Sequence, residues 1–287
     1  MEANNFTINP DCCWHGAPEI TKYLDVLTRR KLQYKTDIDN RYTDTTKSLN
    51  VDGYSVINSF IEKDRLLSVK NEFEEIKNSG ELQYNDFYTE QVAHPLLNCK
   101  SVSNIAFDDR IINIAKNFFG CMPVLNNVQL RKSKATNMQE SSIPGNGSTT
   151  LFHCDKNSPR FLKFFFYLDD VGPKNGPFTY VEGSHIKKFS GWKNKLRWTQ
   201  EEIESKYGTD KIKTFFGMPG DLIIANTNGF HKGMKITEGE RLLLVLFYNI
   251  HPTEWRKSPP WSGMMKKQTF DSLPEWKKPL ADYINKV

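Results

Sequence analysis

The sequence predicts a mainly β fold with flanking helices, built as an antiparallel barrel or sandwich. After about residue 121, short apolar runs alternate with turn signals, which is typical of many short antiparallel strands. Before residue 121, apolar residues recur mainly every three or four positions, which is the spacing of a helix. The chain of 287 residues, 38% of them hydrophobic, is long enough to bury one substantial core.

The N-terminal part is expected to form a helical layer on the β structure. Residues 1–50 are polar and weakly periodic, and we expect an arm packed on the domain. Residues 52–57 are typical of a turn followed by a short strand. Apolar residues between Leu66 and Ile76 recur at spacings of 3, 4 and 3, which predicts a helix ending near Gly80. A second helix is expected between Asp108 and Gly120.

The second half is expected to consist of strands with one helical interruption. Thr199 and Glu202 form a capping box that predicts the start of that helix, with Gly208 as its end. We predict a single domain over residues 1–287, with an arm (1–50), a core (51–250) and an irregular tail (251–287). The expected strands cover residues 124–130, 149–153, 160–168, 178–181, 212–216, 221–225 and 242–248.

Composition disfavours several classes of protein. Lys and Arg number 39 against 34 Asp and Glu, a spread-out excess of +5 that is unlike the clustered basic footprint of a nucleic-acid-binding protein. No apolar run approaches the roughly 20 residues of a membrane span. The N-terminus lacks the pattern of a secretory signal. The five cysteines fit neither a disulfide framework nor a zinc site, so we expect a reducing, cytoplasmic location.

One of the six histidines stands in a distinctive motif. His153 and Asp155 form an HxD pair, and residues i and i+2 of a strand point to the same face. His231, which follows the expected strand 221–225, is the best candidate for a third ligand. Two histidines and one carboxylate form the facial triad of non-haem Fe(II) oxygenases, which leaves coordination positions open.

An HxD pair by itself is weak evidence, because a hydrogen-bonding histidine followed by a turn aspartate has the same sequence. Arg241 strengthens the metal interpretation. It follows His231 by ten residues, at the start of the expected strand 242–248. A buried cation needs an anionic partner, and a carboxylate co-substrate would supply one through bidentate hydrogen bonds. A surface ion pair is the alternative for Arg241.

Taken together, these motifs resemble the phytanoyl-CoA dioxygenase family of Fe(II)- and 2-oxoglutarate-dependent oxygenases, over roughly residues 50 to 250. The resemblance implies a double-stranded β-helix, a distorted jelly roll or cupin-like barrel, in agreement with the expected strands. The segments that carry it, besides His231 and Arg241, are DGYSVINSF (52–60), FHCD (152–155), YLDD (167–170), NGP (175–177), EGSH (182–185) and GD (220–221).

The resemblance implies an enzyme that hydroxylates a C–H bond and releases succinate and CO2, using Fe(II), 2-oxoglutarate and O2. His153, Asp155 and His231 would hold the iron, and Arg241 would bind the distal carboxylate of 2-oxoglutarate. Related halogenases carry a small residue where Asp155 stands, so hydroxylation is favoured over halogenation. Desaturation, ring formation and demethylation by hydroxylation stay open. No catalytic residue beyond the metal ligands is expected.

Further contacts are expected on two strands. Gln129 and Lys163 are assigned to the co-substrate, although Lys163 departs from the hydroxyl or other polar residue that the family often places there. Lys163 could instead reach the substrate or extend to solvent from a strand edge. Arg131 and Ser133 share the face of Gln129 and are expected to line the substrate mouth. His185 is expected to be structural or near the mouth.

The expected substrate is a small metabolite, and Lys163, Arg131 and the net charge of +5 favour an anionic one. Its selection is expected to depend on the loops 134–150 and 186–210. His15, His94 and His251 are interpreted as non-ligands. Two other classes stay open: a cupin-type metal-dependent isomerase or hydrolase, and a non-catalytic relative that binds a ligand.

Overall fold

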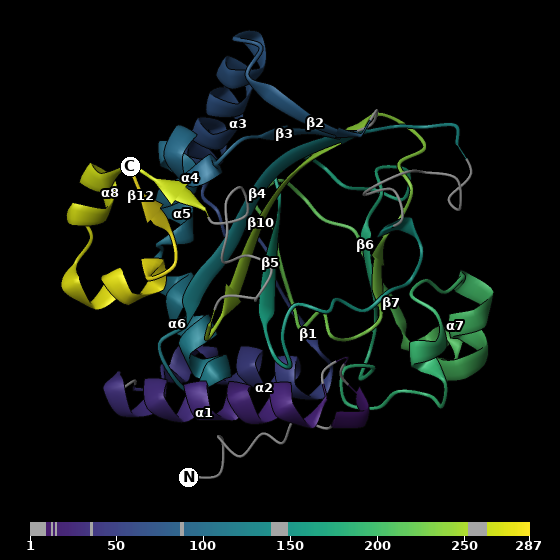
Figure 1. Cartoon of the computed structure of the whole chain (residues 1–287). Coiled ribbons are helices and arrows are strands. Elements are labelled where there is room, and N and C mark those ends of the chain that lie inside the picture. The colour runs from purple at the N-terminus through teal and green to yellow at the C-terminus, as the bar shows by residue number, and fades with distance from the viewer. Residues whose placement is uncertain are drawn as a thin grey trace.

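The computed structural model describes residues 10–12, 14, 16–34, 37–86, 89–138, 149–251 and 263–287. Its framework is a seven-stranded antiparallel sheet in the order β1-β8-β5-β10-β4-β3-β2. A three-stranded sheet, β7-β6-β9, lies beside it (Figure 1). These two sheets and their helices confirm the predicted mainly β fold with flanking helices.

The strands have the following bounds. The large sheet contains β1 (Tyr54–Ile57), β2 (Leu82–Asp86), β3 (Thr89–Val92), β4 (Val124–Lys134), β5 (Leu162–Tyr167), β8 (Leu222–Ala225) and β10 (Glu240–Asn249). The small sheet contains β6 (Phe178–Val181), β7 (Ile212–Phe215) and β9 (His231–Gly233). Near the C-terminus, β11 (Met264–Met265) pairs in parallel with β12 (Asn285–Lys286).

The helices surround this framework as Figure 1 shows. The α-helices are α1 (Ala17–Gln33), α2 (Thr43–Val51), α3 (Lys63–Asn78), α4 (Pro95–Asn98), α5 (Lys100–Ala106), α6 (Asp109–Phe119), α7 (Gln200–Tyr207) and α8 (Lys267–Asp271). Short 3-10 helices cover Pro10–Cys12, Asn40–Tyr42, Trp192–Asn194, Thr209–Lys211 and Glu275–Ala281.

The two faces of the large sheet have different partners. On β5, Phe164 and Phe166 pack into the core that includes α1, α3, α5 and α6, whereas Phe165 and Tyr167 pack against the small sheet. This division follows from the alternation of side chains along a strand. Lys163 shares the face of Phe165, which we call the inner face. The inner face is where the expected site residues of β4 and β5 lie.

Local signals account for the helix ends. Asp108 caps α6 by accepting a hydrogen bond from Arg110 N, and Gly120 ends it in the left-handed conformation, at φ 67°. The capping box of Thr199 and Glu202 is present at the start of α7, as predicted.

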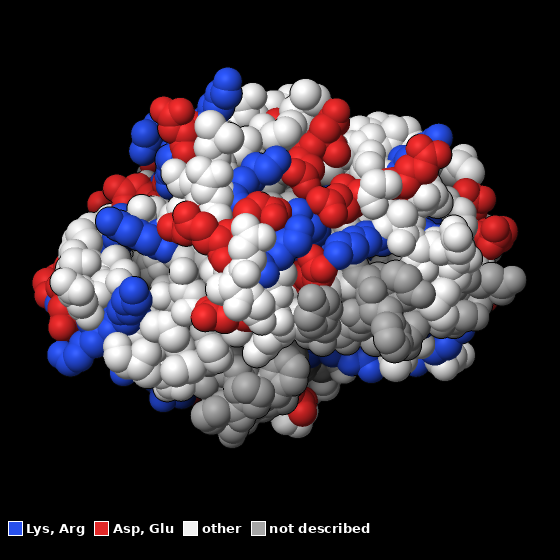
Figure 2. Space-filling view, turned by 90° about the horizontal axis from the view of Figure 1, so that it is seen from above, with Lys and Arg blue, Asp and Glu red and all other residues white. Residues whose placement is uncertain are grey.

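The expected arm contains more helix than the sequence revealed, and one expected strand needs correction. The expected arm contains α1 and α2, and the sequence did not reveal α1 because only four residues along its 17 are buried, one of them Arg30. The expected strand 149–153 is limited to isolated bridges at Phe152 and His153. No helix within the described ranges is long and apolar enough to cross a membrane. On the face drawn in Figure 2, acidic and basic side chains are interspersed, without a basic stripe.

Candidate metal centre and co-substrate cavity

Backbone hydrogen bonds bring the three predicted metal ligands together. His153 N donates to His231 O at 3.0 Å, and His231 N donates to His153 O at 2.9 Å. Asp155 N donates to Thr227 O at 2.9 Å. These hydrogen bonds fix the HxD segment beside residues 227–231, which lead into β9 and lie far from it in the sequence.

Both imidazoles are oriented for metal binding. The Nδ1 atoms of His153 and His231 lie 2.9 Å from the carbonyl oxygens of Leu151 and Gly229. A carbonyl oxygen only accepts, so each Nδ1 carries the hydrogen and each Nε2 keeps a lone pair. Burial, and then the neighbouring His231, lowers the pKa of His153 to about 3, and burial lowers the pKa of His231 to about 4. Both rings are therefore neutral near pH 7.

Asp155 completes the group and is held by a lysine. Lys163 Nζ donates to Asp155 Oδ2 at 2.6 Å. Burial alone would raise the pKa of Asp155, but Lys163, His231 and His153 together outweigh burial and keep that pKa well below its ordinary range. Asp155 is therefore a carboxylate, with one oxygen bonded to Lys163.

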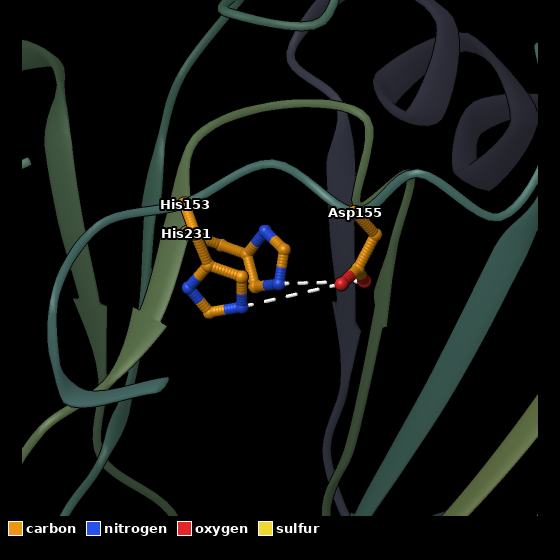
Figure 3. A group of neighbouring side chains, drawn as sticks. All are labelled: His153, Asp155 and His231. Carbon is orange, nitrogen blue, oxygen red and sulfur yellow. Dashed lines mark ion pairs between the residues drawn. The ribbon is translucent and has the colours of Figure 1, made fainter. Parts of the chain in front are cut away.

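The three side chains point toward one another (Figure 3). His231 Nε2 lies 3.5 Å from Asp155 Oδ2, and His153 Nε2 lies 4.0 Å from Asp155 Oδ1. One ligand atom from each residue lies within 4.8 Å of the other two. Because neutral Nε2 atoms and carboxylate oxygens are all acceptors, their convergence leaves an electron-rich point that suits a cation. Two nitrogen donors and one oxygen donor fit a non-haem iron ion.

Arg241 is buried at the start of β10, as the motif analysis expected. Its Nη1 donates to the carbonyl oxygen of Gly176. Its Nε has no hydrogen-bond partner among the residues that the structure describes. Burial lowers the pKa of Arg241, and no Asp or Glu among the described residues opposes that effect. A buried guanidinium with an unused donor is stabilised when an anion binds to it.

A cavity of about 250 Å³ joins the three ligands to Arg241, and we call it the metal cavity. The predicted residues Gln129, Arg131, Ser133 and Lys163 all line it. The structure thus brings every predicted site residue to one cavity. Their roles toward a co-substrate or a substrate stay predictions, and Lys163 is already engaged by Asp155.

Sequence reasoning missed part of this lining. Tyr167 lines the metal cavity, donates to Phe215 O at 2.9 Å and accepts from Phe178 N at 2.9 Å. Thr89 of β3 also lines it, 3.5 Å from Ser133 through their hydroxyl oxygens. The spacing of Lys163 and Tyr167 on one strand could have identified Tyr167. Nothing local points to Thr89, because only the pairing of β3 with β4 brings it there.

The other histidines that the structure describes lie outside the metal group. His185 Nε2 is 3.1 Å from Asn50 O, which fits the structural role that was expected, and burial lowers its pKa to about 4. His94 precedes α4, and His251 packs edge-on against Tyr23. His15 lies outside the described residues, as does the segment 139–148 of the expected loop 134–150.

Comparison with known proteins identifies the architecture. Residues 49–241 match the family model described as phytanoyl-CoA dioxygenase (PhyH). A search of the curated proteins found no match.

Three solved structures illustrate the likeness. The non-heme alpha ketoglutarate dependent carbocyclase SnoK from nogalamycin biosynthesis is 16% identical, with a TM-score of 0.57 over 74% of this chain and 86% of that chain. HygX from Streptomyces hygroscopicus, with nickel, 2-oxoglutarate and hygromycin B bound, is 20% identical, with a TM-score of 0.52 over 74% and 87%. EctD from S. alaskensis, with bound Fe, is 19% identical, with a TM-score of 0.52 over 75% and 80%. These matches confirm the double-stranded β-helix.

Proposed function

Because the chain belongs to the phytanoyl-CoA dioxygenase family, whose model matches residues 49–241, we propose that it is an Fe(II)- and 2-oxoglutarate-dependent dioxygenase that hydroxylates a C–H bond of a small molecule. When bound, the iron supplies the oxidative chemistry that couples O2 to the conversion of 2-oxoglutarate into succinate and CO2. The protein holds, orients and shields the reacting groups.

One observation supports this proposal most strongly. Two neutral imidazoles, one carboxylate and one buried guanidinium with an unused donor line the same cavity. A metal site alone would fit a cupin-type isomerase or hydrolase equally well. The buried Arg241 distinguishes the proposal, because it requires an anion in the metal cavity and the distal carboxylate of 2-oxoglutarate is one.

The residues of this chain have separate tasks in the proposed enzyme. His153, Asp155 and His231 hold the iron, with their orientation fixed by backbone partners. Arg241 binds the far carboxylate of 2-oxoglutarate by charge-assisted hydrogen bonds. Lys163 holds the second oxygen of Asp155, so that the carboxylate presents the first. The aromatic side chains of Phe165, Tyr167 and Phe178 supply apolar lining to the cavity.

The residues that line the cavity support an anionic substrate less strongly than they support iron and 2-oxoglutarate. Lys163 is neutralised by Asp155, and Lys134, which also lines the metal cavity, is paired with Glu90. Arg131 and Lys235 also line the metal cavity, and they are the residues that favour the anionic substrate suggested by the sequence.

An anaerobic titration tests the proposal. Fe(II) and 2-oxoglutarate are added to the purified apoprotein, and the visible charge-transfer absorption of their complex is recorded. We expect an absorption band that disappears in His153→Ala and Asp155→Ala. In Arg241→Ala it should require much more 2-oxoglutarate. Folded protein that binds Fe(II) but gives no band would favour the cupin-type alternative, whereas failure to bind iron at all would favour a non-catalytic relative.

A further inference from the structure

A second cavity, of about 220 Å³, adjoins the metal cavity. Gln129 of β4 lines both cavities, so they meet at this side chain. Residues of β2, β3 and β4 line the second cavity together with the start of α4 and C-terminal residues, so it lies toward the β2 edge of the large sheet. A ligand could therefore extend from the metal centre past Gln129 into the second cavity.

Carboxamide side chains are the main polar groups of this second cavity, which we call the amide-lined cavity, and the rest of its lining is apolar apart from His94. The five that line it are Gln83, Gln91, Asn126, Asn127 and Gln129. Strand register places them together: Gln83 pairs with Gln91, and Gln91 pairs with Arg131. Such cross-strand neighbours have side chains about 5 Å apart. Asn127 and Gln129 precede Arg131 along β4 at intervals of two residues, and so they share its face.

A β-bulge brings the fifth carboxamide to the same place. The register of β10 with β4 shifts between Phe247, which pairs with Asn127, and Tyr248, which pairs with Leu125. Asn126 is the extra residue, and its Nδ2 donates to His251 O at 3.3 Å. A bulge changes the direction of side chains on the bulged strand. Here it allows two successive asparagines to line one cavity.

The amide-lined cavity lies within reach of the metal centre. Lys163 pairs with Phe247 across β5 and β10, and Phe247 pairs with Asn127 across β10 and β4. Two strand spacings separate Asn127 from Lys163, which corresponds to roughly 10 Å. Because Lys163 contacts Asp155 directly, one small molecule can place a group at Asn127 and a C–H bond beside the metal.

The two cavities differ in charge. Among the described residues that line the amide-lined cavity there is no Asp, Glu, Lys or Arg, and His94 is the titratable one. Burying an ion without a partner is costly, so this lining disfavours a charged ligand group. Each carboxamide offers two donor hydrogens and an acceptor oxygen, whereas a hydroxyl offers one donor and two acceptor lone pairs. Carboxamides therefore match a group that carries several hydroxyls.

We propose that the amide-lined cavity binds an uncharged, hydroxyl-rich ring of the substrate, of the sugar or cyclitol class. This inference rests on the proposed function for the identity of that ligand as the substrate. Each cavity is smaller than the roughly 300–1,000 Å³ of small-molecule sites, and together they fall within that range. The metal cavity then takes 2-oxoglutarate and the reacting carbon, and the amide-lined cavity takes the ring.

One residue that lines the amide-lined cavity has a strained backbone conformation. His94 lines the amide-lined cavity and has φ 45°, although it precedes Pro95. Ser59 and His94 are the non-glycine residues with positive φ among those described. Such strain persists where the surrounding structure enforces it, and it clusters at ligand sites.

Saturation-transfer NMR on the full chain tests the proposal, with Zn(II) as a diamagnetic substitute for iron and with 2-oxoglutarate present. Three probes share a six-membered ring: myo-inositol is uncharged and hydroxylated, cyclohexanecarboxylate is anionic, and cyclohexylammonium is cationic. We expect saturation transfer to myo-inositol in preference to the other two. Gln91→Leu and Asn127→Leu should each weaken its binding about fivefold, as the loss of a hydrogen bond predicts. Gln268→Leu on exposed α8 is the matched control and should have no effect.

An isosteric variant distinguishes a loss of ligand binding from a folding defect. Asn127→Asp keeps the shape of the side chain and adds a negative charge, so it should weaken the binding of myo-inositol and favour cyclohexylammonium. The inference is overturned if myo-inositol does not bind, if a charged probe binds better to the unmodified protein, or if the variants bind myo-inositol unchanged. Binding of 2-oxoglutarate is recorded in the same samples, and its loss would count against the proposed function rather than against the amide-lined cavity.

Discussion

Replacement of Lys163 by methionine tests which group neutralises the charge of Asp155 when no metal ion is bound. In the apoprotein, Lys163 is the cation that neutralises Asp155, at a distance of 2.6 Å. When a divalent metal binds, it supplies that positive charge itself. Lys163→Met should therefore destabilise the apoprotein but should have little effect on the stability of the metal-bound protein.

The magnitude follows from burial. The side chains of Lys163 and Asp155 are 22% and 17% exposed, so the pair lies between the buried and the surface cases. Removing one partner of a buried pair costs about 3–5 kcal/mol, and an exposed pair contributes about 0–1 kcal/mol. We expect a loss of about 2 kcal/mol for this partly screened pair. In a chain of this size, that corresponds to roughly 5 °C in Tm.

The assay is thermal unfolding of both proteins in EDTA and in excess Co(II). Metal should raise the Tm of Lys163→Met by about 5 °C more than it raises the Tm of the unmodified protein. Lys174→Met is the matched control, because its ion pair with Glu238 is 62% and 64% exposed and its loss should change neither Tm nor the response to metal. Equal apoprotein Tm values, with equal responses to Co(II), would refute the assigned pairing.

Three further predictions follow, two from the site and one from the buried His185. Arg241→Lys keeps the charge but loses the two-pronged geometry, so titration should show about 10–100-fold weaker 2-oxoglutarate binding with Zn(II) binding retained. Gly229→Ala would place a Cβ against Tyr180 Oη and so displace the carbonyl that orients His231, and calorimetry should show weaker metal binding. His185 has a pKa of about 4 in the folded state and about 6.5 when unfolded, so the unfolded chain binds the extra proton between these values. Stability should therefore fall as the pH drops through that window, by about 1.4 kcal/mol per unit, and urea unfolding of His185→Gln should show a shallower dependence.

A control or a contradicting result checks each of these predictions. For the glycine, Gly172→Ala is the comparison, because its added Cβ would lie 3.5 Å from the nearest atom, at ordinary contact distance. Unchanged 2-oxoglutarate affinity in Arg241→Lys would show that the anion binds elsewhere. An equally steep loss of stability in His185→Gln would assign the proton uptake to other groups.

Local sequence determined much of the fold and the ligand types. Helix α6 was predictable because its capping residue, its apolar spacing and Gly120 are all near neighbours in the chain. Helix α1 was not, because a polar helix with four buried positions acquires its stability from the surface that it covers. His153 and Asp155 were recognisable because a spacing of two residues sets a common direction.

Only the tertiary structure decided how these residues are connected. The pairing of Lys163 with Asp155 depends on the path of the chain between β5 and the HxD segment, and no periodicity specifies that path. Thr89 and the carboxamides of β2 and β3 reach the site through strand register, since pairing partners come from distant parts of the sequence. The sequence by itself therefore determined which groups are able to bind a metal and an anion. The pairing of the strands decided their distances, their charge balance and the second cavity beside them.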